Sequence, residues 1–300
     1  MLKQITGITR VRMLYLQLQF ACNFRCQHCF HGQLLDSPLR YTSSDAIALV
    51  EHFRTEYALE AVTLLGGEPL LYPDVVAVAE HCKRAGLAVE ICTNGHRGFF
   101  GVIRALAPFL DKFRVSIDGI ATTHDAIRQR GSFASALDAL ELAKELGLTT
   151  GVTMTVTSTN IGEVVPLAKM LDAHGVGEIK LHCLRLVGNA AGHPELAVAE
   201  DEAYTALHQQ IAEADLRLDV LYDSDLNPEP VGEACSNLIG ADHLDRIEAD
   251  PRGGLTVSCK AVGRDVSAFR WDSVVGDIVY EPRATDELAV PIPDVVYVNA

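Results

Sequence analysis

Strand and helix signals alternate along the first 215 residues of this chain. Short apolar segments are followed by longer segments with helix start and stop signals. Strands are expected at residues 14–20, 61–65, 87–92, 112–117, 148–156 and 178–184. Helices are expected at residues 43–57, 73–86, 132–146, 160–174 and 200–214, with Ser43 or Ser44 and Asn160 as caps. The strands are apolar on both faces, which is typical of a parallel sheet covered by helices. The alternation therefore predicts an α/β fold.

Six strand–helix units are fewer than the eight that close a full barrel. We therefore expect a partial (β/α)6 TIM barrel over residues 1–215. From about Arg217 the segments become short, with clustered Pro and acidic residues, and a hairpin strand is expected after Gly253-Gly254, ending at residues 257–259. Residues 216–300 are predicted to form a small second domain. The chain is 48% hydrophobic, so 300 residues suffice to bury such a core without disulfides.

Four polar or glycine-rich motifs follow predicted strands. They are the segment 22–29, Gly66-Gly67-Glu68-Pro69, Thr93-Asn94-Gly95 and Ser116-Ile117-Asp118-Gly119. The carboxyl ends of barrel strands carry the chemistry of such folds. Four motifs at the same rim predict an active site there.

The first motif contains Cys22, Cys26 and Cys29, spaced C-x3-C-x2-C. A [4Fe–4S] cluster normally takes four cysteines, so three leave one iron open to a ligand that is not protein. An open metal position is typical of a site that binds a ligand or catalyses a reaction. His28 and His31 lie nearby and keep a zinc site as an alternative.

The net charge of −15 limits the partners of this chain. It argues against nucleic acid, because a phosphate backbone needs a basic surface. It favours a cationic substrate, although acidity can also serve solubility alone. No apolar run approaches the roughly 20 residues that cross a bilayer, and the N-terminus lacks the pattern of a signal peptide. We expect a cytoplasmic protein with reduced or metal-bound cysteines.

These residues resemble the radical S-adenosylmethionine (SAM) enzymes. The resemblance covers residues 14–185 and rests on the cysteine spacing after a first strand and on the GGEP motif at residues 66–69. It implies that Cys22, Cys26 and Cys29 hold a [4Fe–4S] cluster whose fourth iron binds SAM. Reductive cleavage of SAM would give a 5′-deoxyadenosyl radical that removes a hydrogen atom from the substrate. A flavodoxin- or ferredoxin-type protein would donate the electron.

The resemblance also implies which residues contact SAM. Glu68 would accept hydrogen bonds from the SAM amino group, Ser116 and Asp118 would contact the ribose, and Arg128 would bind the SAM carboxylate. The other expected contacts are His28 and Phe30 at the adenine, Asn94, Gly66, Gly67 and Pro69. The structural alternatives are an ordinary turn for the glycines, a capped strand end for Ser116 and Asp118, and a surface arginine for Arg128.

Residues 216–300 resemble a shortened auxiliary-cluster domain, called SPASM or twitch. Cys235 and Gly254-x4-Cys259 match the start of that pattern, and Val275-Gly276-Asp277-Ile278 resembles its end. The later cysteines of a full SPASM domain are absent. Only Cys183, Cys235 and Cys259 remain as ligands, because Cys82 falls in a predicted helix and Cys92 ends a predicted strand. A second [4Fe–4S] cluster would need a fourth ligand from the substrate or from another side chain.

Without a second cluster, Cys259 or Cys235 would donate a hydrogen atom to a substrate radical, as epimerases of this family are expected to do. A buried structural cysteine is the alternative.

The combined features predict an enzyme that modifies a natural product, such as an aminoglycoside-like small molecule, by epimerisation or dehydrogenation at a carbinol carbon. Only 21 residues precede Cys22, so we expect no domain that binds a leader peptide before it, with a separate leader-binding protein as the alternative. The acidic stretch from Asp219 to Glu233 suits amino groups, with a solvated loop as its alternative. A maturase of ribosomal peptides, forming an epimer or a crosslink, is the second hypothesis. A non-catalytic iron–sulfur or zinc protein is the third.

Overall fold

The computed structural model describes residues 2–199, 201–223, 226, 238–256 and 269–280. Its strands follow the order β12-β11-β10-β9-β1-β2-β3-β4-β5-β6-β7, with β8 beside β9. The parallel strands and their connecting helices confirm the predicted partial (β/α) TIM barrel, and antiparallel strands follow it in sequence. The chain divides into two compact units, one of residues 1–21, 36–90 and 231–300, the other of residues 22–35 and 91–230. No helix in the described ranges is long and apolar enough to cross a membrane.

The first unit is built around strand β1, which pairs in parallel with β2 on one side and with β9 on the other. Strands β10, β11 and β12 continue the sheet beyond β9 in antiparallel order. The strands of this unit are β1 (Arg10–Gln17), β2 (Ala61–Leu65), β8 (Leu238–Gly240), β9 (His243–Ala249), β10 (Gly254–Thr256), β11 (Phe269–Asp272) and β12 (Asp277–Tyr280). Its helices are α1 (Leu2–Thr6), α2 (Ser43–Glu56) and α3 (Val75–Arg84), with the 3-10 turn η2 (Pro69–Leu71).

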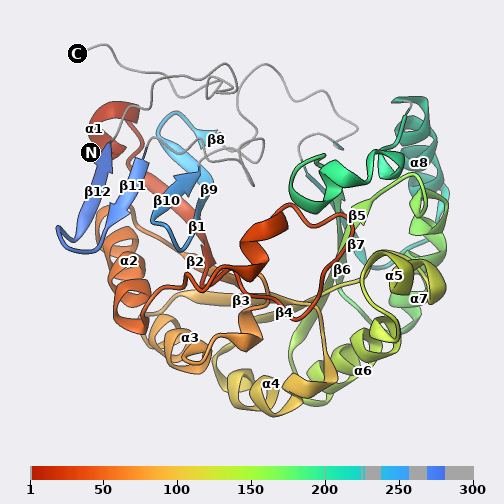
Figure 1. Ribbon diagram of the computed structural model, residues 1–300, viewed down its shortest axis with the longest axis horizontal. Coiled ribbons are helices and arrows are strands. Elements are labelled where there is room, and N and C mark those ends of the chain that lie inside the picture. The colour runs from red at the N-terminus through yellow and green to blue at the C-terminus, as the bar shows by residue number, and fades with distance from the viewer. Residues whose placement is uncertain (1, 200, 224–225, 227–237, 257–268, 281–300) are drawn as a thin grey trace. The chain divides into compact units, whose positions relative to one another are not determined.

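One face of β1 packs against helix α2 (Figure 1). Leu14 and Leu16 of β1 are fully buried, as are Leu49 and Phe53 of α2. Helix α2 begins after Thr42, whose hydroxyl accepts from the backbone N–H of Asp45 at 3.1 Å. Thr42 is therefore the N-cap, and the expectation of Ser43 or Ser44 was wrong. A hydroxyl one residue earlier reaches the unpaired N–H groups of the first turn equally well.

The second unit carries four parallel strands in the order β4-β5-β6-β7. Figure 1 shows helices α6 and α7 along one side of these strands. The strands are β4 (Lys112–Ser116), β5 (Thr149–Val156), β6 (Glu178–Cys183) and β7 (Asp219–Tyr222). The helices are α4 (Phe100–Leu106), α5 (Thr122–Ile127), α6 (Ser132–Glu145), α7 (Val164–Ala173) and α8 (Asp201–Glu213). The 3-10 turns are η3 (Arg97–Phe99), η4 (Ala107–Phe109), η5 (Ile161–Glu163), η6 (Gly188–Gly192) and η7 (Pro194–Leu196). Strand β3 (Ala88–Thr93) and turn η1 (Gly32–Asp36) each span a unit boundary.

The first strand differs most from its prediction. It begins at Arg10 and ends at Gln17, whereas residues 14–20 were expected. The early start was missed because Arg12 interrupts the apolar pattern of the sequence. In the structure its side chain pairs with Asp245 of β9 at 2.6 Å, so the strand continues through it. The sequence analysis also missed the short helices α4 and α5. The domain boundary at residues 215 and 216 stays a prediction.

Candidate active site

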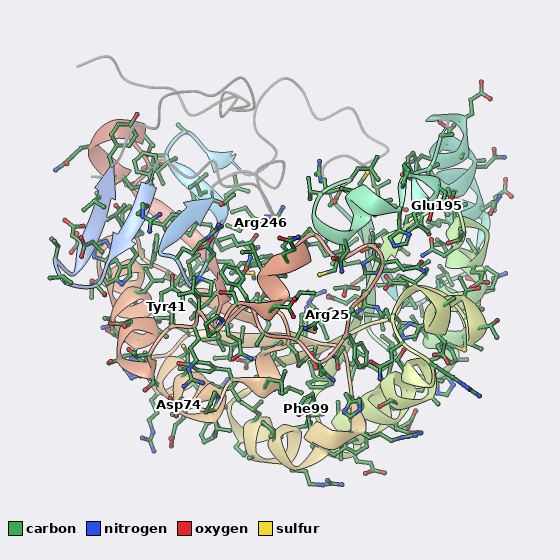
Figure 2. All side chains as sticks on the ribbon, viewed as in Figure 1. Arg25, Tyr41, Asp74, Phe99, Glu195 and Arg246 are labelled. Atoms are coloured by element: carbon green, nitrogen blue, oxygen red, sulfur yellow. The ribbon has the colours of Figure 1, made fainter. Side chains whose placement is uncertain are left out.

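The three cysteines lie in a loop of the second unit that runs from Cys22 to turn η1. Cys26 is buried, and Cys22 and Cys29 are partly exposed. Figure 2 labels Arg25 on this loop. Its guanidinium donates to the carbonyl oxygens of Cys22 at 2.7 Å and Phe24 at 2.9 Å. The loop is thus folded back on its own backbone between the first and second cysteines.

Residues at the end of β3 and in α5 hold the first part of the loop. Asn94 donates to the side-chain oxygen of Asn23 at 2.8 Å and accepts from the backbone N–H of His96 at 3.0 Å. The backbone N–H of Gln27 donates to the carbonyl of Ile127 at 2.9 Å. Asn94 is therefore hydrogen-bonded to the cysteine loop through Asn23. Its contact with SAM, which the resemblance implies, stays a prediction.

Asp118 is the centre of the polar interior of the second unit. Its carboxylate is fully buried and accepts from three groups: Nε2 of His28 at 2.6 Å, Nε of Arg128, and the backbone N–H of Thr155 at 2.8 Å. The side chains of His28 and Arg128 are only 8% and 11% exposed. Three residues predicted separately as SAM contacts therefore form one hydrogen-bonded group.

The charges in this group determine its protonation. Burial by itself raises the pKa of Asp118, but the charges of Arg128 and His28, with the hydrogen bonds from His28 and Thr155, hold that pKa well below its usual range. Burial raises the pKa of Cys26 to about 11, although the nearby charge of Arg128 lowers it. Nη1 of Arg128 lies 4.0 Å from Sγ of Cys26. Asp118 is therefore ionised, and Cys26 needs a metal to lose its proton at neutral pH.

Loops on both sides support Asp118. The ring of His124 accepts the backbone N–H of Asp118 at Nδ1, at 3.1 Å. Asn160 is fully buried and donates to the carbonyls of Asp118 at 3.1 Å and Thr155 at 2.9 Å. Asn160 was expected to cap a helix, but its side chain makes no cap hydrogen bond. Its amide instead ties the end of β4 to the end of β5.

The GGEP motif lies in the first unit, against the residues that lead into the cysteine loop. The backbone N–H groups of Gly67 and Glu68 donate to the carbonyls of Gln19 at 2.8 Å and Ala21 at 2.9 Å. A Cβ on Gly66 would lie 2.7 Å from the Gln19 carbonyl oxygen, and one on Gly67 would overlap the backbone of Phe20 and Ala21. The glycines are needed for this close approach of two backbones.

Glu68 and Pro69 of the GGEP motif are buried. The Glu68 carboxylate is 1% exposed and accepts from the backbone N–H of Leu70 at 3.0 Å. Pro69 is the first residue of turn η2. The expected contact of Glu68 with the SAM amino group stays a prediction.

Ser116 lies at the end of β4 beside two other polar side chains. Its hydroxyl is 3.2 Å from Thr153 Oγ1 and 3.7 Å from Cys92 Sγ. Phe30, the expected adenine contact, packs on the ring of His31 with centroids 4.2 Å apart. Cys82 and Cys92 fall in α3 and β3, as predicted. Cys235 and Cys259 lie outside the described residues.

The donor set fits a [4Fe–4S] cluster. Soft thiolates are the ligands of such clusters, and three are present in one loop as thiols. Among the described side chains, no three His, Cys, Asp or Glu are grouped to hold a single metal ion. That grouping is not what a cluster requires, because each thiolate binds a separate iron. Cys22, Cys26 and Cys29 would hold the cluster, which leaves one iron for SAM.

The chain combines a partial (β/α) barrel with a three-cysteine loop after its first strand. These two features indicate an iron–sulfur protein built on a (β/α) barrel. The family described as the Radical SAM superfamily matches residues 16–171, which is more than half of the chain. The chain belongs to the Radical SAM superfamily, whose members use a [4Fe–4S] cluster and SAM.

Curated relatives match the same part of the chain. Pre-heme d1 synthase of Dinoroseobacter shibae is 32% identical over 174 residues, 56% of this chain and 42% of that protein. AdoMet-dependent heme synthase of Methanosarcina barkeri is 29% identical over 203 residues, 66% of this chain and 57% of that protein. Mycofactocin maturase MftC of Mycobacterium ulcerans is 29% identical over 191 residues, 62% of this chain and 50% of that protein. The chain thus spans about half the length of these relatives.

Solved structures share the fold at low sequence identity. Streptococcus suis SuiB bound to S-adenosylmethionine has a TM-score of 0.68 at 14% identity, covering 88% of this chain and 64% of that chain. The structure of anSMEcpe with bound AdoMet and the Cp18Cys peptide has a TM-score of 0.63 at 15% identity, covering 87% of this chain and 76% of that chain. The likeness supports the barrel and its antiparallel C-terminal strands.

Several polar residues that shape this site were not identified from the sequence. Asn23, His124 and Glu163 carry no motif of their own, so only the folded structure assigns them a role. The Glu163 carboxylate holds the loop after Asp118, because it accepts hydrogen bonds from the backbone N–H of Ile120 and from Oγ1 of Thr123, both at 2.6 Å. Gly188-Asn189 is a turn-like dipeptide, a signal that could have directed attention to the connection after β6.

Proposed function

We propose that this chain is a radical SAM enzyme that removes a hydrogen atom from a carbinol carbon of a polar natural product, an aminoglycoside-like small molecule, and so epimerises or dehydrogenates it. When bound, the cluster and SAM supply a 5′-deoxyadenosyl radical from one electron of a flavodoxin- or ferredoxin-type donor. The reducing cytoplasm suits the thiols that hold the cluster.

The observation that carries this proposal is the polarity of the strand faces that turn away from the helices. In the second unit, alternate residues of β4, β5 and β6 form one buried face, with Val115, Val152 and Ile179 fully buried, and helix α6 packs against β4 and β5. The other face carries hydroxyls, charges and an imidazole: Lys112, Arg114, Ser116, Thr153, Thr155, Glu178, Lys180 and His182. The interior of an ordinary (β/α) barrel is filled with branched apolar side chains. A polar face at the same place suits a polar substrate.

The first unit has the same division. Leu14, Leu16 and Ile247 are fully buried on the helix side of β1 and β9. On the other side, Gln17 donates to the carboxylate of Glu248, and the guanidinium of Arg246 lies 5.4 Å from the ring centre of Tyr15. Planar amide, carboxylate and guanidinium groups offer donors and acceptors that match a hydroxylated ring. This second polar face supports the same substrate class.

Residues around the cysteine loop are expected to prepare the cluster site. Arg128 places a positive charge near Cys26, which favours the thiolate. Asp118 fixes that arginine and the ring of His28. Cys259 or Cys235 would donate the hydrogen atom in an epimerisation, and the ligands of a second cluster would come from Cys183, Cys235 and Cys259.

The test is an anaerobic incubation of reconstituted protein with SAM, dithionite and an aminoglycoside in deuterated water. Epimerisation predicts solvent deuterium at the inverted carbon, lost in Cys259→Ala and kept in Cys92→Ala. A two-electron loss without deuterium indicates dehydrogenation. Loss of deuterium in Cys92→Ala alone would identify Cys92 of β3 as the hydrogen-atom donor. Formation of 5′-deoxyadenosine without any change in a panel of aminoglycosides would contradict the substrate class.

A peptide maturase is the second candidate. It is supported by the similarity to mycofactocin maturase MftC and by the fold shared with SuiB, which has been solved with its precursor peptide SuiA. Mass spectrometry of a co-expressed peptide would detect an epimer or a crosslink. Absence of 5′-deoxyadenosine with SAM and dithionite, despite a full complement of iron, would instead indicate a non-catalytic iron–sulfur protein.

A further inference from the structure

The connection after strand β6 touches the cysteine loop within the second unit. It contains turn η6, which runs from Gly188 to Gly192 and lies beyond the residues that match the superfamily. The backbone N–H of Asn189 donates to the carbonyl of Cys29 at 2.8 Å, and its side-chain Nδ2 donates to the carbonyl of Cys26 at 3.0 Å. One residue thus binds the carbonyls of two of the three cysteines.

Glycines bring the two segments close enough for these bonds. Gly188 has a φ of +61°, and a Cβ there would lie 2.6 Å from the Cys29 carbonyl oxygen and overlap the carbonyl of Phe30. Gly32 has a φ of +56°, and a Cβ there would lie 2.8 Å from Cα of Gly188. The two backbones are therefore in direct contact, and a side chain at either position would separate them.

The segment that Gly188 contacts also provides hydrogen bonds to the Cys29 sulfur. The backbone N–H groups of His31 and Gly32 form hydrogen bonds to the Cys29 side chain. These N–H groups belong to the segment that Gly188 supports. Hydrogen bonds to the ligand sulfurs and the second layer of contacts set the potential and stability of iron–sulfur centres.

We infer that Gly188 and Asn189 form a clamp that positions the Cys26–Cys29 half of the cysteine loop and tunes the cluster it binds. Both are positioning residues, because they act through the cysteine backbone. The inference rests on these cysteines binding the cluster, and it extends the site to the connection after β6.

The first test uses the full chain without its cluster. Hydrogen exchange at residues 27–31 should become about tenfold faster in Asn189→Ala, the change expected when a net hydrogen bond of ordinary strength is lost. Ser158→Ala is the matched control, because it removes a 2.6 Å bond to the carbonyl of Glu195 in the same connection without touching the cysteine loop. Gly188→Ala should also speed exchange, whereas Gly192→Ala, with open space around the added methyl, should not.

The second test uses the reconstituted protein. In Asn189→Ala the cluster should be lost faster to an iron chelator, and its reduction potential should become more negative because a donor dipole is removed. Asn189→Asp should lower the potential further by adding a negative charge. Changes in the electron paramagnetic resonance signal and in the potential separate a clamp from a residue that only stabilises the fold.

Unchanged exchange, cluster lifetime and potential in Asn189→Ala would overturn the clamp. If Gly188→Ala does not fold, the result for Asn189→Ala decides alone. A wild-type chain that binds no iron would instead contradict the cluster assignment, so the two failures are distinguishable.

Discussion

The carboxylate of Asp118 accepts a hydrogen bond from Nε2 of His28 at 2.6 Å, although 90 positions separate the two residues in the sequence. His28 lies between the second and third cysteines, and Asp118 follows strand β4. The bond therefore connects the cysteine loop to the end of a barrel strand inside one unit. Arg128 completes the connection by pairing with the same carboxylate while lying near Cys26.

Asp118→Asn should destabilise the cluster-free protein by about 3 kcal/mol at neutral pH, because it leaves Arg128 buried without its counter-charge. The pKa of Asp118 is depressed in the folded state, so its contribution is present above its ordinary value of 3.8 and is lost as the pH falls. Urea unfolding of both proteins at pH 7 and near pH 3.5 measures the gap. Asp138→Asn, at an exposed carboxylate paired with Arg97, should have little effect. An Asp118→Asn protein as stable as the wild type at pH 7 would contradict the electrostatic role.

Replacing Cys22, Cys26 or Cys29 by Ala should remove most of the bound iron after anaerobic reconstitution. With only two thiolates left, two of the four irons would have no protein ligand. Cys82→Ala is the control, since this thiol is fully buried in α3. Iron and sulfide analysis of the wild type should give about four of each per chain for one cluster, or about eight for two. In the second case, Cys259→Ala should lower the count to about four. Full iron content in Cys26→Ala would contradict the assigned ligands.

The extent to which the sequence predicts this molecule follows from how local each signal is. The strands and helices were predictable because alternating apolar runs and caps are local patterns, and β5 and α6 differ from prediction by one residue at an end. The role of Asn160 was not predictable, because its side chain does not cap its own helix. It donates to the carbonyl of Asp118, 42 positions away. A residue that can cap locally gives no sign in the sequence that a distant partner has taken its hydrogen bonds.

The candidate site shows the same division. The cysteine spacing and the GGEP motif are local, and both were recognised. The convergence of His28, Asp118 and Arg128 on one carboxylate depends on which strand ends meet, so the sequence supplied three separate candidates and not one group. The glycines of GGEP were predicted to admit a ligand, and the structure adds that they admit the backbone of residues 19–21.

Gly67→Ala should destabilise the protein by about 3 kcal/mol or more, because the added methyl would overlap the backbone carbonyls of Phe20 and Ala21. Gly101→Ala is the matched control, since it lies in helix α4 with open space around the added methyl. That control should be neutral or slightly stabilising, because alanine favours a helix over glycine. Thermal unfolding of the two variants compares the effects. A Gly67→Ala protein as stable as the wild type would show that the GGEP backbone does not need this close approach.

The Cys26 thiol should resist alkylation in the cluster-free protein. Burial raises its pKa to about 11, so at pH 8 the reactive thiolate is scarce. Because the folded pKa lies above the ordinary value of 9.0, the thiol form stabilises the cluster-free fold below that value, and this contribution is lost as the pH rises toward 11. Iodoacetamide labelling followed by peptide mass spectrometry, from pH 7 to pH 11, gives the profile for each cysteine in turn. Arg128→Met should shift the Cys26 profile to still higher pH, because the nearby positive charge is removed. A Cys26 thiol that reacts at pH 7 as fast as a free thiol would contradict the effect of its burial, and an unchanged profile in Arg128→Met would contradict the role of Arg128.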